Sequence, residues 1–240
     1  MSIENKLTTV AENQEKVFDA GKNSERENFW YHFTMGGTRR VYNYAFGTRG
    51  GNNAYWGDIF YPKYDMKPTQ ADDMFANFRC SDSSKQIDLE SRLNEMGVVL
   101  DFSKCSNFTT AFSYCTGIET LPVIDMSNAS GTNTNYVFDS STIKTIRKII
   151  LGTKSKSQYL FLRANGLENV EFEGEILSSM NFNSANNLTH DSLMNIINAL
   201  KDYSEDTSGT VYTITLGSTN KAKLTDDELN MITNKGWTYA

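Results

Sequence analysis

The sequence predicts an α+β repeat fold: a short, irregular solenoid with an N-terminal helix and an α/β C-terminal cap. Three observations predict it. A unit that begins with phenylalanine recurs about every two dozen residues through the middle of the chain. A heptad-spaced segment precedes these units, and a segment with helix, strand and helix periodicity follows them. Periods of roughly 20 to 50 residues are typical of stacked repeats.

These patterns divide the chain into four regions. They are an N-terminal amphipathic or coiled-coil helix (1–28), an aromatic, glycine-rich N-terminal cap (29–85), the repeat solenoid (86–188) and a C-terminal cap (189–240).

The first region is expected to be helical over residues 2–28. Ile3, Leu7, Val10 and Val17 lie on a short heptad seam that Gln14 and Gly21 interrupt. Such a seam indicates either a stalk that forms a homotrimer or dimer, or one amphipathic helix packed on its own domain. Both interpretations stay open.

The second region is rich in aromatic side chains and glycine pairs. Gly36-Gly37 and Gly50-Gly51 supply turns between short strands, and the aromatic residues supply bulk. We expect residues 29–64 to cover the open end of the repeats. A sugar-stacking surface is the alternative.

The repeated unit has a phenylalanine, a small residue three positions later and a large apolar residue six positions later. A small residue fits where the chain bends inward. Four of the phenylalanines are expected to line up in one column, since a single repeat cannot bury its own apolar face; they are Phe112, Phe138, Phe161 and Phe182. The five units are Phe102–Phe108, Phe112–Ile118, Phe138–Ile143 (one residue shorter), Phe161–Leu167 and Phe182–Leu188.

Apolar residues after each unit predict short strands. Ile118, Leu121 and Ile124 are matched by Ile143, Ile146 and Ile149. The polar residues between these inward positions should face outward in a ladder; they are Asp125, Lys148 and Glu171.

Local signals place the remaining elements. Residues 86–97 read as a short helix that Gly97 ends. In the C-terminal region, Thr189 is an N-cap, Thr225 and Glu228 form a capping box, and Trp237 is expected to fold back as a plug. The alternation over residues 211–216 predicts a strand.

The unit Phe112–Ile118, followed by Leu121 and Ile124, resembles the BspA-type leucine-rich repeats over roughly residues 100–188. This resemblance implies a leucine-rich-repeat-like solenoid with one short strand in each turn. Two departures make an irregular sheet the expectation: only two units keep the cysteine, and the repeat length drifts from 25 to 21 residues.

The two ends of the chain carry a second resemblance. The opening Leu7–Gly21 and the closing Lys235–Thr238 are similar to the ends of small proteins from phage and prophage tail gene clusters of gut Firmicutes. This resemblance implies a virion-associated role in host attachment, with other virion proteins as partners.

Composition argues against several classes. The formal net charge is −6 and basic residues do not cluster, so a nucleic-acid partner is not expected. The polar start of the chain indicates no signal peptide. The sequence contains no run of about 18 apolar residues, so membrane insertion is not expected. We expect a protein made in the host cytoplasm and located in the virion.

No catalytic, cofactor-binding or metal-binding residue is predicted, and the ligand-binding residues are unknown. His32 and His190 lack metal-ligand spacing, and Glu171 with Glu173 is the one conceivable glycosidase pair. The three cysteines are interpreted as reduced, core-filling thiols, with a Cys105–Cys115 disulfide as the alternative.

The function expected is that of a non-enzymatic recognition or attachment protein of the phage tail receptor-binding type. It would present its repeat surface to a host cell-surface glycan or protein. One alternative is a structural tail or assembly protein that packs on other virion subunits, which should show large apolar patches. The other is a glycan-cleaving enzyme, which needs two carboxylates in a cleft.

Overall fold

The structure is a computed structural model, and it describes residues 55–60, 62, 65–154, 156 and 158–240. The helix and the homotrimer or dimer expected from residues 2–28 lie outside this part of the chain, as does most of the aromatic segment 29–64.

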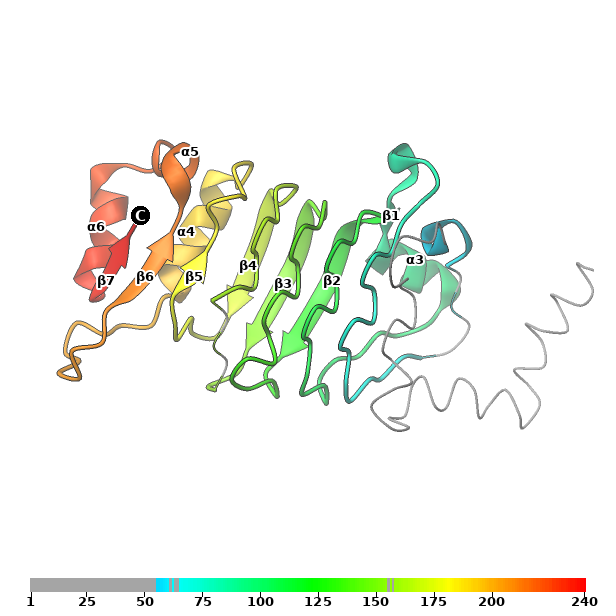
Figure 1. Cartoon of the computed structure of the whole chain (residues 1–240), viewed down its shortest axis with the longest axis horizontal. Helices are drawn as coiled ribbons and strands as arrows, with labels where there is room; N and C mark the ends of the chain where they lie inside the picture. Colours follow the sequence, from blue (N-terminus) through cyan, green and yellow to red (C-terminus); the bar gives the residue numbers. More distant parts are fainter. Residues whose placement is uncertain (1–54, 61, 63–64, 155, 157) are drawn as a thin grey trace, which may run out of the picture.

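The described residues form short strands, α-helices and 3-10 turns (Figure 1). In chain order they are η2 Trp56–Ile59, η3 Ser83–Lys85, β1 Ile87–Asp88, α3 Leu89–Met96, β2 Ile118–Met126, β3 Thr145–Leu151, β4 Asn169–Glu173, β5 Met180–Asn181, α4 His190–Ala199, β6 Tyr212–Thr215, α5 Gly217–Lys221, α6 Asp226–Asn234 and β7 Trp237–Tyr239.

The strands make two sheets in which every neighbouring pair is parallel. The first sheet has the order β1-β2-β3-β4 and the second has the order β5-β6-β7. In the first sheet Leu121 lies level with Ile146, which in turn lies level with Val170. All three side chains are buried, so the inward positions of successive strands fall in rows.

The expected fold class, an α+β leucine-rich-repeat-like solenoid, is wrong. The described strands form all-parallel sheets of four and three strands with few helices, which is an α/β-type arrangement. The physical reason is the connections: a parallel pair needs a crossover of about a dozen or more residues. Each link between consecutive strands from β1 to β4 is that long, and α4 supplies the crossover from β5 to β6.

The expected phenylalanine column is confirmed. The rings of Phe112, Phe138, Phe161 and Phe182 stack in order, with centroids 5.6, 5.3 and 5.0 Å apart. Phe75 adds one more ring, 5.1 Å from Phe112 and nearly parallel to it. All five side chains are buried, so the column forms the centre of the core between the sheet and the turns that carry it.

Backbone hydrogen bonds join the phenylalanine-bearing turns to one another. The Phe112 N–H donates to the Val137 carbonyl at 2.8 Å, and the Phe138 N–H donates to the Leu160 carbonyl at 3.0 Å. The small residue three positions after phenylalanine is buried in every unit, as expected. Gly166 lies so close to the neighbouring turn that an added Cβ would be 2.6 Å from the Thr142 carbonyl oxygen.

Helix α4 takes the place of a fifth strand beside β4 (Figure 1). The Val170 N–H donates to the Ser192 hydroxyl at 3.0 Å, and the Phe172 N–H donates to the Asn195 side-chain oxygen at 2.6 Å. An open parallel edge would leave these donors unpaired or available to another chain. Two side chains of α4 therefore close the edge of the first sheet.

Most local predictions at the two ends are confirmed, but the helix expected over 86–97 begins only at Leu89, because Ile87–Asp88 pair with β2 as strand β1. Gly97 ends α3 in the left-handed conformation, at φ 63°. Thr189 caps α4, and Thr225 and Glu228 form the capping box of α6. Trp237 is buried as expected, but it is the first residue of strand β7 and not a separate plug. Its indole N–H donates to the Lys201 carbonyl at 2.7 Å.

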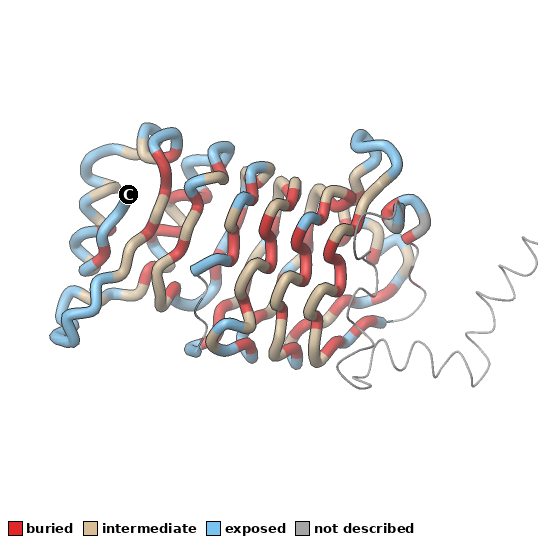
Figure 2. Tube along the Cα trace, viewed as in Figure 1, coloured by how far each residue is buried: buried red, intermediate tan, exposed pale blue. Residues whose placement is uncertain are grey.

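Buried residues run through the whole described length (Figure 2). One cluster of buried apolar side chains extends from Phe60 to Trp237. The two sheets therefore share a single hydrophobic core and are not separate folding units by this criterion.

Candidate functional site

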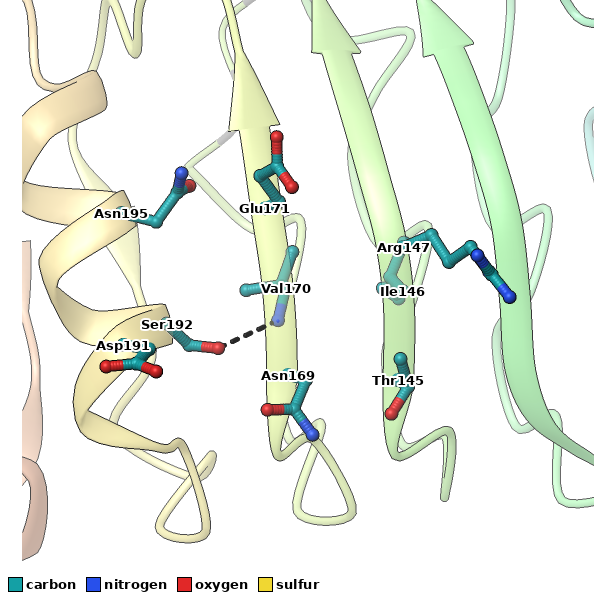
Figure 3. Close-up of a pocket in the computed structure, with 9 residues that line it drawn as sticks. All are labelled: Thr145, Ile146, Arg147, Asn169, Val170, Glu171, Asp191, Ser192 and Asn195. Atoms are coloured by element: carbon teal, nitrogen blue, oxygen red, sulfur yellow. Dashed lines mark hydrogen bonds between the residues drawn. The ribbon is translucent and has the colours of Figure 1, made fainter.

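A shallow hollow of about 310 Å³ lies on the sheet face beside α4 (Figure 3). Strands β3 and β4 form its floor, and the first turns of α4 form one wall. The lining side chains are Thr145, Ile146, Arg147, Asn169, Val170, Glu171, Asp191, Ser192 and Asn195.

Most polar groups of this hollow already have structural partners. Ser192 and Asn195 accept the edge N–H groups of β4, and Asn169 accepts a hydrogen bond from the Thr189 hydroxyl at 3.1 Å. Arg147 extends away from α4 in Figure 3 and pairs with Glu90. The hollow thus lies where helix α4 replaces a strand beside β4. Its polar side chains join the helix to the sheet.

An ion-pair cluster lies farther along strands β3 and β4. The Lys148 ammonium lies 3.3 Å from the Glu171 carboxylate and 3.1 Å from the Glu173 carboxylate. These hydrogen bonds, Glu173 first, raise the pKa of Lys148. One cation thus bridges the two carboxylates that were the conceivable glycosidase pair. The expected outward ladder holds for Lys148 and Glu171, but Asp125 lies level with Ile150 and not with Lys148.

A different surface forms on the phenylalanine-bearing turns. Phe161 of these turns packs against Phe172 of β4, with ring centroids 6.2 Å apart. Because the core lies between the sheet and these turns, their outward side chains form a face separate from that of the sheet. We call it the tyrosine face and define it by Tyr114, Tyr136, Asp139, Tyr159 and Arg163.

The backbone of the turns projects three of these side chains outward. Tyr114, Tyr136 and Arg163 have φ of 54°, 58° and 58°, the left-handed region that bulky residues rarely adopt. Hydrogen bonds to the next turn hold this geometry: the Tyr114 N–H donates to the Asp139 carbonyl at 2.8 Å, and the Tyr136 N–H donates to the Tyr159 carbonyl at 3.1 Å. The same left-handed φ occurs at Asp73, Asn77, Thr110 and Ser140, so it belongs to the backbone of successive turns and is not by itself a sign of function.

Aromatic rings are held at this surface in a fixed arrangement. The Tyr136 and Tyr159 rings stack with centroids 5.3 Å apart and planes 5° from parallel. Tyr159 is 36% exposed and Tyr114 is 45% exposed. Exposed, pre-ordered tyrosines offer apolar area and a hydroxyl at low entropic cost, which suits recognition.

A charged pair adjoins the rings. The Arg163 guanidinium donates two hydrogen bonds to the Asp139 carboxylate, at 2.9 and 2.7 Å. Asp139 is buried and Arg163 is exposed. The pKa of Arg163 is raised, mainly by the bonds to Asp139, with smaller contributions from Tyr114 and Tyr136 nearby. The carboxylate thus orients a guanidinium whose outer side faces solvent beside the tyrosines.

The remaining candidates from the sequence fall elsewhere. Cys105 and Cys115 are free and buried, so the disulfide alternative is wrong, and desolvation raises the pKa of each thiol to about 12. His190 is exposed, and its ring nitrogen lies 2.9 Å from Glu228. His32 lies outside the described residues. Within the described ranges, no group of three or more His, Cys, Asp or Glu side chains is placed to hold a metal ion.

Sequence reasoning missed the tyrosine face because its positions do not repeat in residue type. The position two before the column phenylalanine carries Asp73, Thr110, Tyr136 and Tyr159 in successive turns. Only the spacing from phenylalanine relates them, so aligning the outward positions of the repeats was the signal that would have found the face.

Comparisons with models of known protein families, with curated proteins and with solved structures find no match to this chain. Over the described residues, no helix is both long enough and apolar enough to cross a membrane.

Proposed function

We propose that this chain is a non-enzymatic recognition protein that binds a ligand on a host cell surface through the tyrosine face. The observation that carries the proposal is the stacked Tyr136–Tyr159 pair, held at the surface beside Tyr114 and the Arg163–Asp139 pair. Tyrosine and arginine are the residues enriched at binding hot spots, where ordered side chains lose little entropy on binding.

The distribution of exposed apolar side chains supports recognition over a purely structural role. A subunit that only packs on neighbours should expose a large contiguous apolar patch. Two of the large apolar side chains that are exposed in the described part of the chain, Tyr114 and Tyr159, belong to the tyrosine face. The others come from separate segments; they are Tyr55, Val99, Val123, Val211 and Tyr239.

The virion location and the phage-tail attachment role are also part of this proposal. They rest on the resemblance of residues 7–21 and 235–238 to the ends of proteins from phage and prophage tail gene clusters. The ligand is accordingly a wall glycan or a surface protein of a bacterial host.

The test is binding of the purified, fluorescently labelled chain to intact bacterial cells and to their extracted wall glycans. We expect saturable binding that falls at least about tenfold when Tyr114→Ser and Tyr136→Ser are combined, since aromatic anchors often contribute more than about 1 kcal/mol each. Tyr239→Ser is the matched control, because it removes an exposed tyrosine from β7, and it should change binding by less than about twofold.

Two results would contradict the proposal. The first is a folded Tyr114→Ser, Tyr136→Ser double variant that binds cells like the native chain, which would exclude the tyrosine face. The second is no binding to any cell or glycan together with stable assembly onto tail proteins, which would establish the structural role instead.

A further inference from the structure

A second hollow, of about 230 Å³, opens at one end of the tyrosine face. Tyr159 and its neighbour Gln158 form one side. Residues 179–181, which include β5, and two threonines of β6 form the other side. The hollow therefore lies where the stacked turns meet the second sheet.

The stacking order explains why Tyr159 borders open space. Tyr136 covers one face of the Tyr159 ring at 5.3 Å. In the next turn the matching position is Met180, two before Phe182, and its side chain is buried as part of β5. No third outward ring follows at that position, so the second face of the Tyr159 ring borders the hollow.

The chemistry of the lining is neutral throughout. Its side chains are one phenol, two amides and three aliphatic hydroxyls, on Tyr159, Gln158, Asn181, Ser179, Thr213 and Thr215. The remaining lining residue, Met180, has its side chain in the core. A site without a cation, in a chain of net charge −6, disfavours anionic ligands.

Internal hydrogen bonds orient part of this lining. The Ser179 hydroxyl accepts the Thr213 N–H at 3.0 Å, and the Asn181 side-chain oxygen accepts the Asn183 N–H at 2.8 Å. The Asn181 amide nitrogen is thereby left for a ligand. Gln158 and Thr215 make no side-chain hydrogen bond to any other residue in the described part of the chain, so their polar groups are available too.

We propose that this hollow binds a single neutral sugar ring, the terminal or branching residue of a cell-surface glycan, stacked on Tyr159. The inference rests on the proposed recognition function and names its ligand class. A sugar ring presents C–H groups on one face, which suit an aromatic ring, and hydroxyls around its rim, which need paired donors and acceptors. Pockets for drug-sized ligands are roughly 300–1,000 Å³, so the smaller volume here fits one ring.

The experiment is a ligand-observed NMR titration of the full chain with neutral monosaccharides: glucose, galactose, mannose, rhamnose and N-acetylglucosamine. Glucuronate and N-acetylneuraminate serve as anionic controls. At least one neutral sugar should bind saturably, and both anionic sugars should bind more weakly. Combining Gln158→Ala with Thr215→Val should weaken the neutral sugar about tenfold, because two hydrogen bonds are lost.

The variants are chosen to leave the fold intact. Gln158 is exposed, and Thr215→Val removes a hydroxyl while keeping the side-chain shape. Thr210→Val is the matched control, since it makes the same change at an exposed position outside the hollow, and it should leave sugar binding unchanged. Binding that survives in the double variant, no saturation by any neutral sugar, or equal binding of the anionic sugars would overturn the inference.

Cell binding separates this inference from the function on which it rests. If cells bind through Tyr114 and Tyr136 but neither free sugar nor the Gln158→Ala, Thr215→Val pair affects that binding, the sugar site is wrong and the recognition function stands. If the sugar binds in the hollow but the chain binds no cell or wall glycan, the site stands and the recognition function is wrong.

Discussion

Phe138 lies between the rings of Phe112 and Phe161, with centroids 5.6 and 5.3 Å away, and is 1% exposed. The two rings that stack on Phe138 are thus 26 and 23 positions away in the chain. At the scale of single residues, stability depends on these contacts between turns, because a short turn buries little area by itself.

Phe138→Ala should lower the free energy of unfolding by about 3–5 kcal/mol, because it leaves a cavity in the middle of the column. Urea denaturation followed by circular dichroism measures this change. Tyr114→Ala is the control, since it removes an exposed ring from the preceding turn and should change stability by less than about 0.5 kcal/mol. A loss below about 1 kcal/mol for Phe138→Ala would show that the column can close over the gap.

The sequence was sufficient to predict four rings of the column, but not the first. Phe75 is followed three positions later by Phe78, where the other units carry Cys, Ser or Ala, and six positions later by Ser81. Phe60 packs on both rings, at 5.8 and 5.5 Å, so a bulky side chain fits here because a different segment covers this end. That contact comes from outside the repeated unit, so the unit itself did not reveal it.

At the scale of elements, the first sheet keeps its size because α4 closes its edge. Ser192 is 5% exposed and accepts the Val170 N–H, while Asn195 accepts the Phe172 N–H. A helix cannot offer a second ladder of backbone groups to a strand, so side chains must satisfy these donors.

Ser192→Ala combined with Asn195→Leu should destabilise the protein by about 2–4 kcal/mol, since two buried donors lose their partners. Hydrogen exchange at the Val170 and Phe172 amides should accelerate more than at other core amides. Asn198→Ala, at an exposed position of the same helix, is the control and should leave both quantities near the native values. Unchanged exchange at the two amides would mean that water or another group pairs them.

Gly166→Ala should also be destabilising, by more than about 1 kcal/mol, because the new Cβ would lie 2.6–2.8 Å from backbone atoms of Thr142. The backbone of this preceding turn cannot move aside without breaking the hydrogen bonds between turns. The neighbouring exposed position supplies the control, Asn165→Ala. Equal thermal unfolding midpoints for the two variants would disprove the close approach of these turns.

Several elements were predictable, and others were not, for reasons of length. The alternation at 211–216 identified β6, and the capping signals located the starts of α4 and α6. The sheet partners of β6, β5 and β7, have only two and three residues. Strands this short show no periodicity, so the sequence did not predict the parallel second sheet. The α+β assignment failed on this point.

At the scale of the whole molecule, one apolar core joins both sheets, and the proposed binding surface lies outside that core. Core positions repeat in residue type because each turn packs on the next, so the sequence reveals them. The left-handed φ at Tyr114, Tyr136 and Arg163 recurs two residues before or after the column phenylalanines, but the residue types at those positions do not repeat and do not favour it. The candidate site was therefore unpredictable where the core was predictable.

Two cysteines buried in the shared core should make the free energy of unfolding fall at high pH. Desolvation raises the pKa of Cys105 and Cys115 from 9.0 to about 12. The unfolded chain therefore loses these protons first, so their contribution is full below about pH 9 and is lost as pH rises towards 12. Each thiol should lower stability by up to about 1.4 kcal/mol per pH unit in that window.

Chemical denaturation from pH 8 to 11 of the native chain and of a Cys105→Ala, Cys115→Ala variant measures this contribution. Other groups titrate in the same range: the pKa of Tyr203 is raised to about 12, and burial lowers the pKa of Lys223 and Lys235. They are common to both proteins and cancel in the difference. The native chain should be the more stable at pH 8, and its advantage should shrink steadily above about pH 9, because the variant has no buried thiols to titrate. A constant difference across the range would mean that the two thiols are not desolvated in the folded state.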